Sequence, residues 1–418
     1  MKHVIIGNGP AGVIAAETLR RAAPADSIVL VGDEPEPPYS RMAIPYLLTD
    51  AIGEEGTWLR KSNGHFATLG IDLAQARVAR VDTKGRALAL EGGGALSYDR
   101  LLIATGSVPR KLGVKGEGLP GVLPCWTLAH AREIIARARP GASVLLVGAG
   151  FIGCIIMEAL ASRGIKLTVA EMGNRMVPRM MTEGAGEMIR LWCEKRGIDV
   201  HLGTRIVEIE PKGARLQADL ANGHSDDYDV IITAAGVAPN VAFLEGSGIA
   251  LGQGVLVDHR MQTNVEGVYA AGDVSQSPEF GSGRQVINAI QPVAAEEARV
   301  AALNMAGRHV KSAGLLAMNV LDTVGLIAAS FGQWQGVPED QGGASVELRD
   351  DAAFRYLRLE FQDDRLVGAT SLGLTDHVGV IRGLIQGRVR LGPWRDRLLR
   401  DPLKLMDAYL ACAQKQVA

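Results

Sequence analysis

The stretch GNGPAG, Gly7 to Gly12, follows the apolar run His3 to Ile6. A stretch of the same form, GAGFIG, Gly148 to Gly153, follows the apolar run Val144 to Val147. Both stretches lead into segments with helical patterning. A G-x-G-x-x-G turn between a strand and a helix is typical of dinucleotide binding, and the flanking strand and helix are the context that the motif requires. Two such turns in one chain therefore predict two dinucleotide-binding sites.

The spacing of the glycines in each turn has a steric reason. The first glycine allows the tight turn, the second lets the backbone approach a pyrophosphate, and the third lets the helix pack against the strand. The phosphates then lie at the N-terminus of the helix, where backbone N–H groups point outward. The first turn contributes Gly7, Gly9, Pro10, Ala11 and Gly12, and the second contributes Gly148, Gly150, Phe151, Ile152 and Gly153.

An acidic residue about twenty positions after each turn completes the motif, because its carboxylate accepts a hydrogen bond from a ribose hydroxyl. In the first half of the chain this residue is Asp33 or Glu34, and in the second it is Glu171. A carboxylate repels the 2′-phosphate of NADP, so the second site is predicted to prefer NAD. Arg175 could offer a contact to such a phosphate, although a solvated loop arginine is the simpler interpretation.

Length and charge predict the number of domains and exclude some classes of partner. A chain of 418 residues is too long for one hydrophobic core and is predicted to form two to four domains. The net charge of −2 creates no field that attracts nucleic acid, so no nucleic-acid partner is predicted. The first strand begins almost at the N-terminus and leaves no room for a signal peptide, which predicts a cytoplasmic protein. The longest uncharged apolar run, Val144 to Met157, is too short to span a bilayer, so no membrane insertion is predicted.

The cysteines and histidines offer no recognisable ligand pattern. The four cysteines are widely spaced and form no CxxC pair, so we expect no iron–sulfur cluster, zinc site or redox dithiol within the chain. The eight histidines show neither HxxxH nor HExxH spacing, and no metal site is predicted. The group Met176, Met180 and Met181 is interpreted as packing.

The two halves of the chain repeat one pattern. YDRLLIATGSVPR, Tyr98 to Arg110, and YDVIITAAGVAPN, Tyr228 to Asn240, each place a strand before a glycine turn. TNVEGVYAAGDV, Thr263 to Val274, is predicted as a strand that ends at an aspartate, and Gln291 to Asn304 as a helix. The first dinucleotide domain is therefore predicted to be interrupted by the second.

These four motifs, in this order over residues 1 to 310, resemble the pyridine nucleotide-disulfide reductase superfamily, the two-dinucleotide flavoproteins related to glutathione reductase. Within it the chain is similar to the branch of ferredoxin reductases, rubredoxin reductases and nitrite reductase flavin domains. The resemblance implies an α/β fold with two Rossmann-like three-layer ββα domains and a C-terminal α+β interface domain. It implies an FAD-binding domain at 1–112 and 240–312, an NAD(H)-binding domain at 113–239, and an interface or partner domain at 313–418.

The resemblance also assigns site residues. For FAD it implies Gly7, Gly9, Pro10, Ala11, Gly12, Asp33, Glu34, Arg41, Ala104, Thr105, Gly106, Gly272, Asp273, Gln291 and Pro292. For NAD(H) it implies Gly148, Gly150, Phe151, Ile152, Gly153, Glu171, Ala235 and Gly236. Asp273 is expected to bond the ribityl–phosphate region of the flavin. The helix from Gln291 is expected to point its positive end at the isoalloxazine, where it stabilises the charge of the reduced ring.

Departures from the family pattern limit the reactions that this chain is predicted to catalyse. Met42 stands where related coenzyme A-disulfide reductases carry a cysteine, and a thioether cannot act as a thiolate nucleophile. Ile155 stands where ferredoxin reductase relatives carry a glutamate. We infer an apolar wall facing the nicotinamide, although the same side chains could equally fill a core; they are Pro45, Tyr46, Phe151 and Ile155. Hydride transfer needs orientation more than proton transfer, so no acid–base catalyst is assigned.

The C-terminal region is predicted to form strands at Phe354 to Phe361 and Arg365 to Thr370, and helices at Asp376 to Gln386 and Pro402 to Lys415. From Asp376 onward, lysines and arginines outnumber acids. This local positive charge could steer an acidic iron–sulfur protein, or it could mark ordinary solvated helix faces.

The predicted function is that of an FAD-dependent NAD(H) oxidoreductase which exchanges single electrons with a separate iron–sulfur or similar carrier. Such a chain could be the flavin subunit of a redox complex, for example an NAD-linked aldehyde oxidoreductase or a nitrite reductase. Two alternatives stay open: a self-contained NADH oxidase, and a redox-dependent binding flavoprotein resembling apoptosis-inducing factor. Homodimerisation is also left open.

Overall fold

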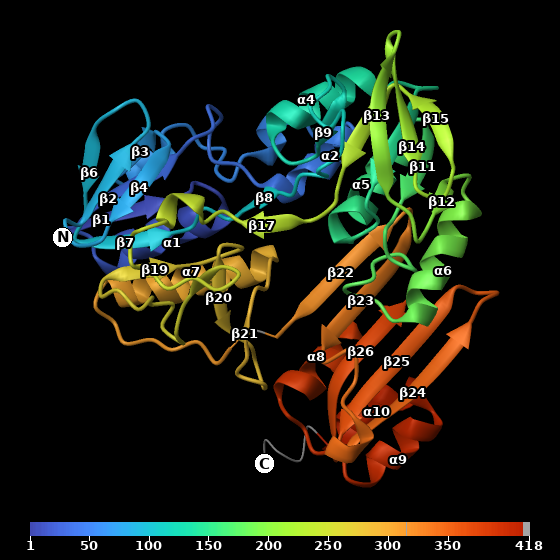
Figure 1. Cartoon of the computed structure of the whole chain (residues 1–418). Helices are drawn as coiled ribbons and strands as arrows, with labels where there is room; N and C mark the ends of the chain where they lie inside the picture. Colours follow the sequence, from blue (N-terminus) through green and yellow to red (C-terminus); the bar gives the residue numbers. More distant parts are fainter. Residues whose placement is uncertain (315, 413–418) are drawn as a thin grey trace. The chain divides into compact units, whose positions relative to one another are not determined.

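The computed structural model describes residues 1–314 and 316–412 (Figure 1). The chain divides into two compact units, and each is described by itself. One unit comprises residues 1–110 and 237–315, and the other comprises residues 111–236 and 316–418. The three-domain division drawn from the sequence stays a prediction.

A five-stranded parallel sheet forms the centre of the first unit, in the order β19-β7-β1-β2-β3. Its strands are β1 (Lys2–Ile6), β2 (Ser27–Gly32), β3 (Ile71–Gln75), β7 (Arg100–Ile103) and β19 (Val268–Ala270). Val4 lies opposite Val29 on one side and Leu101 on the other, and all three are buried. Continuous apolar runs of this kind are typical of parallel strands that are covered on both faces.

Helices α1 (Pro10–Ala22) and α7 (Gln291–Met305) pack against each other and against this sheet. Both helices bury small side chains, Ala15 and Ala16 on α1 and Ala298 and Ala301 on α7, which lets their axes approach closely. An antiparallel sheet consists of β4 (Val78–Asp82), β5 (Ala87–Leu90) and β6 (Ala95–Ser97). The remaining elements are η1 (Arg41–Ala43), α2 (Ile44–Leu48), η2 (Glu54–Thr57), α3 (His65–Thr68), β8 (Ser107–Pro109), β17 (Val237–Pro239), η3 (Ala242–Leu244), β18 (Val255–Leu256), β20 (Ser275–Pro278) and β21 (Gln285–Val286).

The second unit contains a parallel sheet of the same arrangement, in the order β12-β11-β10-β16-β9. Its strands are β9 (Val122–Pro124), β10 (Ser143–Val147), β11 (Lys166–Ala170), β12 (Asp199–His201) and β16 (Val230–Thr233). Its helices are α4 (Leu128–Arg137), α5 (Phe151–Ala161) and α6 (Glu183–Glu194). A three-stranded antiparallel sheet follows the pattern of the first unit, with β13 (Ile206–Lys212), β14 (Arg215–Leu220) and β15 (Ser225–Tyr228). The two nucleotide folds are therefore copies of one topology, as the sequence repeat predicted.

The C-terminal part of the second unit is an antiparallel sheet in the order β22-β23-β26-β25-β24, followed by helices. Its elements are β22 (Met318–Thr323), β23 (Leu326–Gly332), η4 (Glu339–Gln341), β24 (Gly343–Asp350), β25 (Arg355–Gln362), β26 (Arg365–Leu372), α8 (Val378–Gln386), α9 (Pro393–Arg400), η5 (Pro402–Lys404) and α10 (Leu405–Cys412). The predicted strands at 354–361 and 365–370 are confirmed, whereas α9 was not predicted. The helix predicted to reach Lys415 is described as far as Cys412, and its last residues lie outside the described part.

Two hydrogen bonds fasten this sheet to helix α6. The Thr182 hydroxyl, at the N-cap of α6, donates to the Tyr356 hydroxyl oxygen at 2.7 Å. The Trp192 indole N–H donates to the carbonyl of Val324 at 3.1 Å. Helix α5 also contacts β22. These contacts explain why the C-terminal part groups with the second nucleotide fold.

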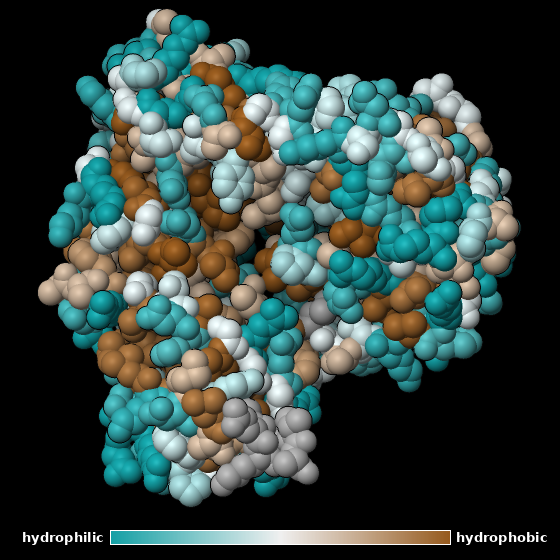
Figure 2. Space-filling view, turned by 180° about the vertical axis from the view of Figure 1, so that it is seen from behind, coloured by the Kyte–Doolittle hydropathy of each residue, from teal (hydrophilic) through white to brown (hydrophobic). Residues whose placement is uncertain are grey.

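The methionine group is packing, as predicted, because Met176, Met180 and Met181 are all buried. Hydrophilic and hydrophobic residues are interspersed over the face shown in Figure 2, and the exposed apolar side chains of the second unit include Leu403, Met406 and Leu410. Within residues 1–314 and 316–412, no helix combines the length and the apolarity that crossing a membrane requires.

Candidate functional site

The first glycine-rich turn joins β1 to α1, and two of its glycines admit no side chain. Gly7 has a φ of +105°, and a Cβ there would stand 2.1 Å from the carbonyl oxygen of Ala104. A Cβ on Gly12 would stand 1.8 Å from the carbonyl oxygen of Gly7. Gly9 differs, because apart from its two chain neighbours no described residue has an atom within 4 Å of the place where its Cβ would be. Two glycines thus close the turn, and the third leaves open space at the start of α1.

The second turn, between β10 and α5, has the same geometry. Gly148 has a φ of +104°, and its Cβ would stand 2.4 Å from the carbonyl oxygen of Ala234. A Cβ on Gly153 would meet the carbonyl oxygen of Gly148 at 2.1 Å. A Cβ on Gly150 would have no described atom within 4 Å apart from its two chain neighbours. Neither α1 nor α5 has a side chain that caps its N-terminus. Both helix starts therefore present backbone N–H groups beside an open position, the arrangement that suits a pyrophosphate.

Glu171, the acid of the second turn, lies directly after β11 and is 9% exposed. One carboxylate oxygen accepts a hydrogen bond from the backbone N–H of Ala149 at 2.6 Å, and the other accepts from the N–H of Gly173 at 2.7 Å. A carboxylate has about four acceptor positions, so these bonds leave acceptor capacity for a ribose hydroxyl. Arg175 donates to the carbonyls of Met181 and Pro178. It is a backbone-bonded loop arginine rather than the solvated one predicted.

The two candidate acids of the first turn have different surroundings. Glu34 accepts hydrogen bonds from the Tyr39 hydroxyl at 2.5 Å and from Arg41 at 2.8 Å. Burial lowers the pKa of Arg41, but the hydrogen bond and charge of Glu34, together with Tyr39, outweigh burial, so the net pKa is raised. The side chain of Asp33 is 52% exposed, and its carboxylate lies 3.9 Å from Arg77. The structure therefore joins Glu34 to Arg41 and leaves Asp33 at the surface.

Asp273 lies close to the same arginine. Its carboxylate accepts a hydrogen bond from the Ser107 hydroxyl at 2.8 Å, and Arg41 lies 3.5 Å from the Ser107 carbonyl oxygen. Burial raises the pKa of Asp273, and the Ser107 bond and the charge of Arg41 oppose that shift. The neighbouring Gly272 has a φ of +83°, and a Cβ there would lie 3.3 Å from the Cβ of Ala11. The predicted FAD residues around Arg41, Asp273 and α1 are therefore brought together in the first unit.

The segment after β7 lies against the glycine turn. The carbonyl of Ala104 is the atom that Gly7 approaches, and the Thr105 hydroxyl donates to the carbonyl of Asn240 at 2.9 Å. Gly106 has a φ of +63°, and its carbonyl accepts the N–H of Asn240. In the second unit, Ala235 and Gly236 follow β16 in the equivalent position, and Gly236 has a φ of +97°.

Helix α7 begins at Gln291, with Pro292 in its first turn and no side-chain cap at Ile290. The Ser40 hydroxyl donates to the Gln291 side-chain oxygen at 3.0 Å. Two turns further on, Glu297 is 1% exposed, and no sequence motif predicted a role for it. Its carboxylate accepts from the Gly272 N–H at 2.8 Å and from the hydroxyls of Ser275 and Ser277.

Glu297 therefore holds the loop that carries Asp273. Burial raises the pKa of Glu297, and the hydrogen bonds from Ser277, Ser275 and Gly272 oppose that shift only in part. The signal in the sequence was a glutamate on an otherwise apolar helix face, with serines at alternate positions of a nearby strand.

The predicted apolar wall is drawn from both units, and each part is described separately. In the first unit Pro45 is partly exposed and Tyr46 is 61% exposed, beside the buried Ile44. In the second unit Phe151 and Ile155 are partly exposed on α5. None of these four side chains is buried, so simple core filling does not account for them. That they face a nicotinamide stays a prediction.

The cysteines are unsuited to redox chemistry. Cys125, Cys154 and Cys193 are buried free thiols, and Cys412 is partly buried. Burial raises the pKa of Cys125 and of Cys193 to about 12, which keeps both as thiols. Met42, at the position of the family nucleophile, is 46% exposed.

Residues 1–292 match the family described as pyridine nucleotide-disulphide oxidoreductase. The chain belongs to this family. The subunit epsilon of the NADH-dependent phenylglyoxylate dehydrogenase of Aromatoleum evansii is 31% identical over 405 residues, which cover 96% of this chain and 95% of that subunit. The NADH oxidase of Methanocaldococcus jannaschii is 30% identical over 320 residues, which cover 74% of this chain and 71% of the oxidase.

Among solved structures, the ferredoxin reductase for the CYP199A2 system from Rhodopseudomonas palustris superposes with a TM-score of 0.85 at 25% identity, over 93% of this chain and 95% of that one. The resemblance drawn from the sequence motifs is thereby confirmed. The chain is an oxidoreductase that binds FAD and NAD(H), and the open positions at Gly9 and Gly150 fit one pyrophosphate each.

Proposed function

We propose that this oxidoreductase takes or returns a hydride at NAD(H) and exchanges single electrons with a separate iron–sulfur protein, as the flavin subunit of a multi-subunit dehydrogenase. The observation that carries the proposal is the combination of two dinucleotide turns with three buried thiols of raised pKa, Cys125, Cys154 and Cys193. The two turns can bind both nucleotides, whereas the three buried thiols are unsuited to form a second redox centre.

The similar proteins support the same proposal. One relative that matches over nearly the whole of both chains is a subunit of an NADH-dependent dehydrogenase. One similar solved structure is a ferredoxin reductase. The first name describes part of a larger enzyme and the second an enzyme that acts on ferredoxin, and we extend these arrangements to this chain.

Bound FAD supplies a centre that accepts a hydride and releases electrons one at a time. The chain's own residues bind and orient the nucleotides. We assign the FAD pyrophosphate to the turn at Gly9, with Arg41 and Asp273 beside it, and the NAD(H) pyrophosphate to the turn at Gly150. Glu171 then accepts the ribose hydroxyl and disfavours a 2′-phosphate, which gives a preference for NAD.

The partner is proposed to be an iron–sulfur protein, and the basic C-terminal residues do not decide whether it is acidic. Arg395 pairs with Asp396, and Lys404 lies 3.8 Å from Asp401. Such local pairs are what ordinary solvated helix faces contain. The partner is therefore argued from the relatives and not from this surface.

A self-contained NADH oxidase is the second candidate, because the Methanocaldococcus jannaschii relative carries that name. It needs only access of oxygen to the flavin. The redox-dependent binding role stays a prediction.

The test is NADH-driven turnover of the FAD-loaded protein with a one-electron viologen dye, with oxygen uptake recorded in parallel. Fast dye reduction with little oxygen uptake is expected. Oxygen uptake at a comparable rate in the absence of dye would overturn the carrier proposal in favour of the oxidase. Glu187→Gln, which removes a partly exposed ion pair with Arg190 in the nucleotide fold that carries Glu171, should turn over like the unmodified protein.

A further inference from the structure

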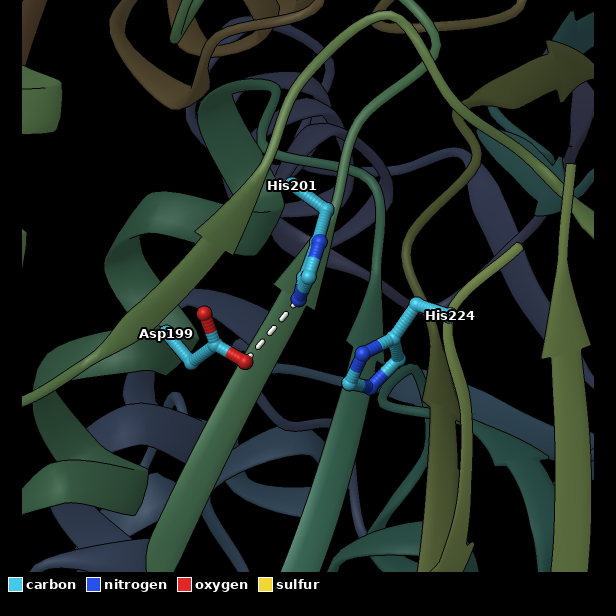
Figure 3. Close-up of side chains that lie close together, drawn as sticks. All are labelled: Asp199, His201 and His224. Atoms are coloured by element: carbon cyan, nitrogen blue, oxygen red, sulfur yellow. Dashed lines mark hydrogen bonds and ion pairs between the residues drawn. The ribbon is translucent and has the colours of Figure 1, made fainter. Parts of the chain in front are cut away.

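Three potential metal ligands lie together at one edge of the second nucleotide fold. They are Asp199 and His201 on β12, and His224 in the turn between β14 and β15. One ligand atom from each residue lies within 4.8 Å of the others, and Figure 3 shows the three side chains converging. These residues do not follow the helical HxxxH or HExxH spacing, so the sequence pattern did not predict a cluster that tertiary folding assembles.

The fold places these side chains for simple reasons. Alternate residues of a strand point to the same face, so Asp199 and His201 share one face of β12. Strand β12 is the edge strand of its sheet, and its pairing aligns His201 with Ala170 of β11. His224 is fixed by the β14–β15 hairpin, where its carbonyl accepts the N–H of Leu220 at 2.8 Å. The two imidazole ring centres are 4.3 Å apart.

Each imidazole ring has a polar partner on the nitrogen that points away from the cluster, and this arrangement favours metal coordination by the other nitrogen. The Nε2 atom of His224 lies 3.2 Å from the hydroxyl of Tyr228, which is 1% exposed and so holds the ring in place. Figure 3 shows the other ring nitrogen of His224 on the side of Asp199 and His201. The Nδ1 atom of His201 lies 3.2 Å from the side-chain amide of Asn222, and its Nε2 lies 2.9 Å from the Asp199 carboxylate. Metal-bound histidines commonly have such a polar partner on the second ring nitrogen.

We propose that Asp199, His201 and His224 form a binding site for a divalent transition metal, with Zn²⁺ as the best-fitting ion and water completing the coordination. Two imidazoles and one carboxylate are ligands that suit Zn²⁺, Co²⁺ or Ni²⁺. Calcium and magnesium require more oxygen ligands than this cluster offers. The proposal departs from the sequence prediction of no metal site.

A metal ion bound here would cross-link two sheets of the second unit, the parallel sheet that contains β12 and the antiparallel sheet that contains β14 and β15; we call this cross-link the clip. The metal replaces the hydrogen bond between His201 and Asp199 and joins the edge strand β12 to the β14–β15 hairpin. The Glu171 backbone N–H donates to the His201 carbonyl at 2.8 Å, so the clip lies beside the strand end that carries the predicted ribose acid. Ions that bind the folded form alone raise its stability by mass action.

The experiment is a calorimetric titration of ZnCl₂ into the FAD-loaded, tag-free protein after treatment with a chelator, followed by thermal unfolding with and without Zn²⁺. One Zn²⁺ per chain and a concentration-dependent rise in Tm are expected. His201→Gln and His224→Gln should each weaken binding by at least about tenfold and abolish the rise in Tm. MgCl₂ should have neither effect.

Two controls separate the cluster from other ligands. His259→Gln removes an exposed histidine of the first unit, and Cys412→Ser removes the only thiol in the described chain that is not fully buried. Both variants should bind Zn²⁺ like the unmodified protein. Loss of binding in Cys412→Ser, or unchanged binding in the double variant His201→Gln/His224→Gln, would overturn the proposal. If a glutamine variant unfolds, Asp199→Asn provides the same test from an exposed position.

Discussion

The carboxylate of Glu171 accepts a hydrogen bond of 2.6 Å from the backbone N–H of Ala149, so the acid at the end of β11 holds the glycine-rich turn that follows β10. The acid of the first fold has no such bond to its turn, because Glu34 bonds Tyr39 and Arg41 instead. The two turns have the same glycine geometry, but the carboxylate of Glu171 bonds its own turn and that of Glu34 does not. Glu171 thus shapes its turn, and recognition of a ribose is the second role that we propose for it.

Replacing Glu171 by Ala should weaken NADH binding far more than FAD binding. The change removes the proposed ribose acceptor and the acceptor of the Ala149 and Gly173 N–H groups. Hydrogen bonds to charged groups contribute about 1.5–3 kcal/mol, which corresponds to a rise in the KM for NADH of about 10- to 100-fold. Steady-state kinetics and the ratio of flavin to protein absorbance measure both effects. Unchanged NADH affinity would contradict the assignment of NAD(H) to this turn.

Replacing Gly9 and Gly12 by Ala should produce two different defects. Gly9→Ala has room for its Cβ within the chain, so folding should be normal while FAD retention falls. Gly12→Ala places a Cβ against the Gly7 carbonyl, and overpacking of this kind costs about 1–3 kcal/mol or more of unfolding free energy. Flavin content and the Tm of the apoprotein distinguish the two. Full flavin content in Gly9→Ala would show that the open position does not face the pyrophosphate.

Local pattern was sufficient to predict the nucleotide folds. Strand, turn and helix are adjacent in sequence at Gly7–Gly12, and the close approach of Gly12 to the Gly7 carbonyl arises within that turn, whereas the close approach of Gly7 to Ala104 depends on strand pairing. The second turn, Gly148–Gly153, is contiguous in sequence in the same way. The strands β25 and β26 were likewise predicted from local patterning. Helix α9 was missed because it spans only eight residues of a mostly charged stretch, which is too short for its few apolar positions to reveal a helical period.

Side-chain pairing across the fold could not be predicted. Glu297 bonds Ser275 and Ser277, and nothing in the spacing of these residues indicates which strand lies against α7. His224 approaches His201 only because a hairpin closes beside an edge strand. Contacts of this kind depend on tertiary packing, which periodicity does not encode.

Asp273→Ala should release FAD. The carboxylate is held by the Ser107 hydroxyl beside Arg41, and its removal takes away a charged acceptor at the proposed flavin site. We expect FAD affinity to fall by about 10- to 100-fold, measured by fluorescence of released flavin on dilution. Ser107→Ala serves as the graded control, because it keeps the carboxylate and should weaken FAD less. A fully flavinated Asp273→Ala protein would rule out this role.

Thiol reagents should leave activity intact. Buried thiols with a raised pKa react slowly because the thiolate is the reactive form. A disulfide exchange reagent added to the native FAD-loaded protein is therefore expected to label Cys412 at most, with no loss of NADH-dependent dye reduction. Met42→Cys supplies the positive control, because position 42 is 46% exposed in the unmodified protein. Inactivation that parallels labelling of Cys125, Cys154 or Cys193 would revive a disulfide-type mechanism.

Glu297 should make stability depend on pH, and Glu297→Gln should remove that dependence. Burial raises the pKa of Glu297 above its ordinary value of 4.5, so the folded state favours the neutral acid. The stabilising contribution of the neutral acid is fully present below pH 4.5, the ordinary value, and is lost as the pH rises through the raised pKa of the folded state. The Tm of the unmodified protein minus that of Glu297→Gln should therefore fall as the pH is raised above 4.5 and level off once the pH exceeds the raised pKa of the folded state. Glu296→Gln, on the exposed side of α7, should show no such trend, and an equal trend in both variants would place the titrating group elsewhere.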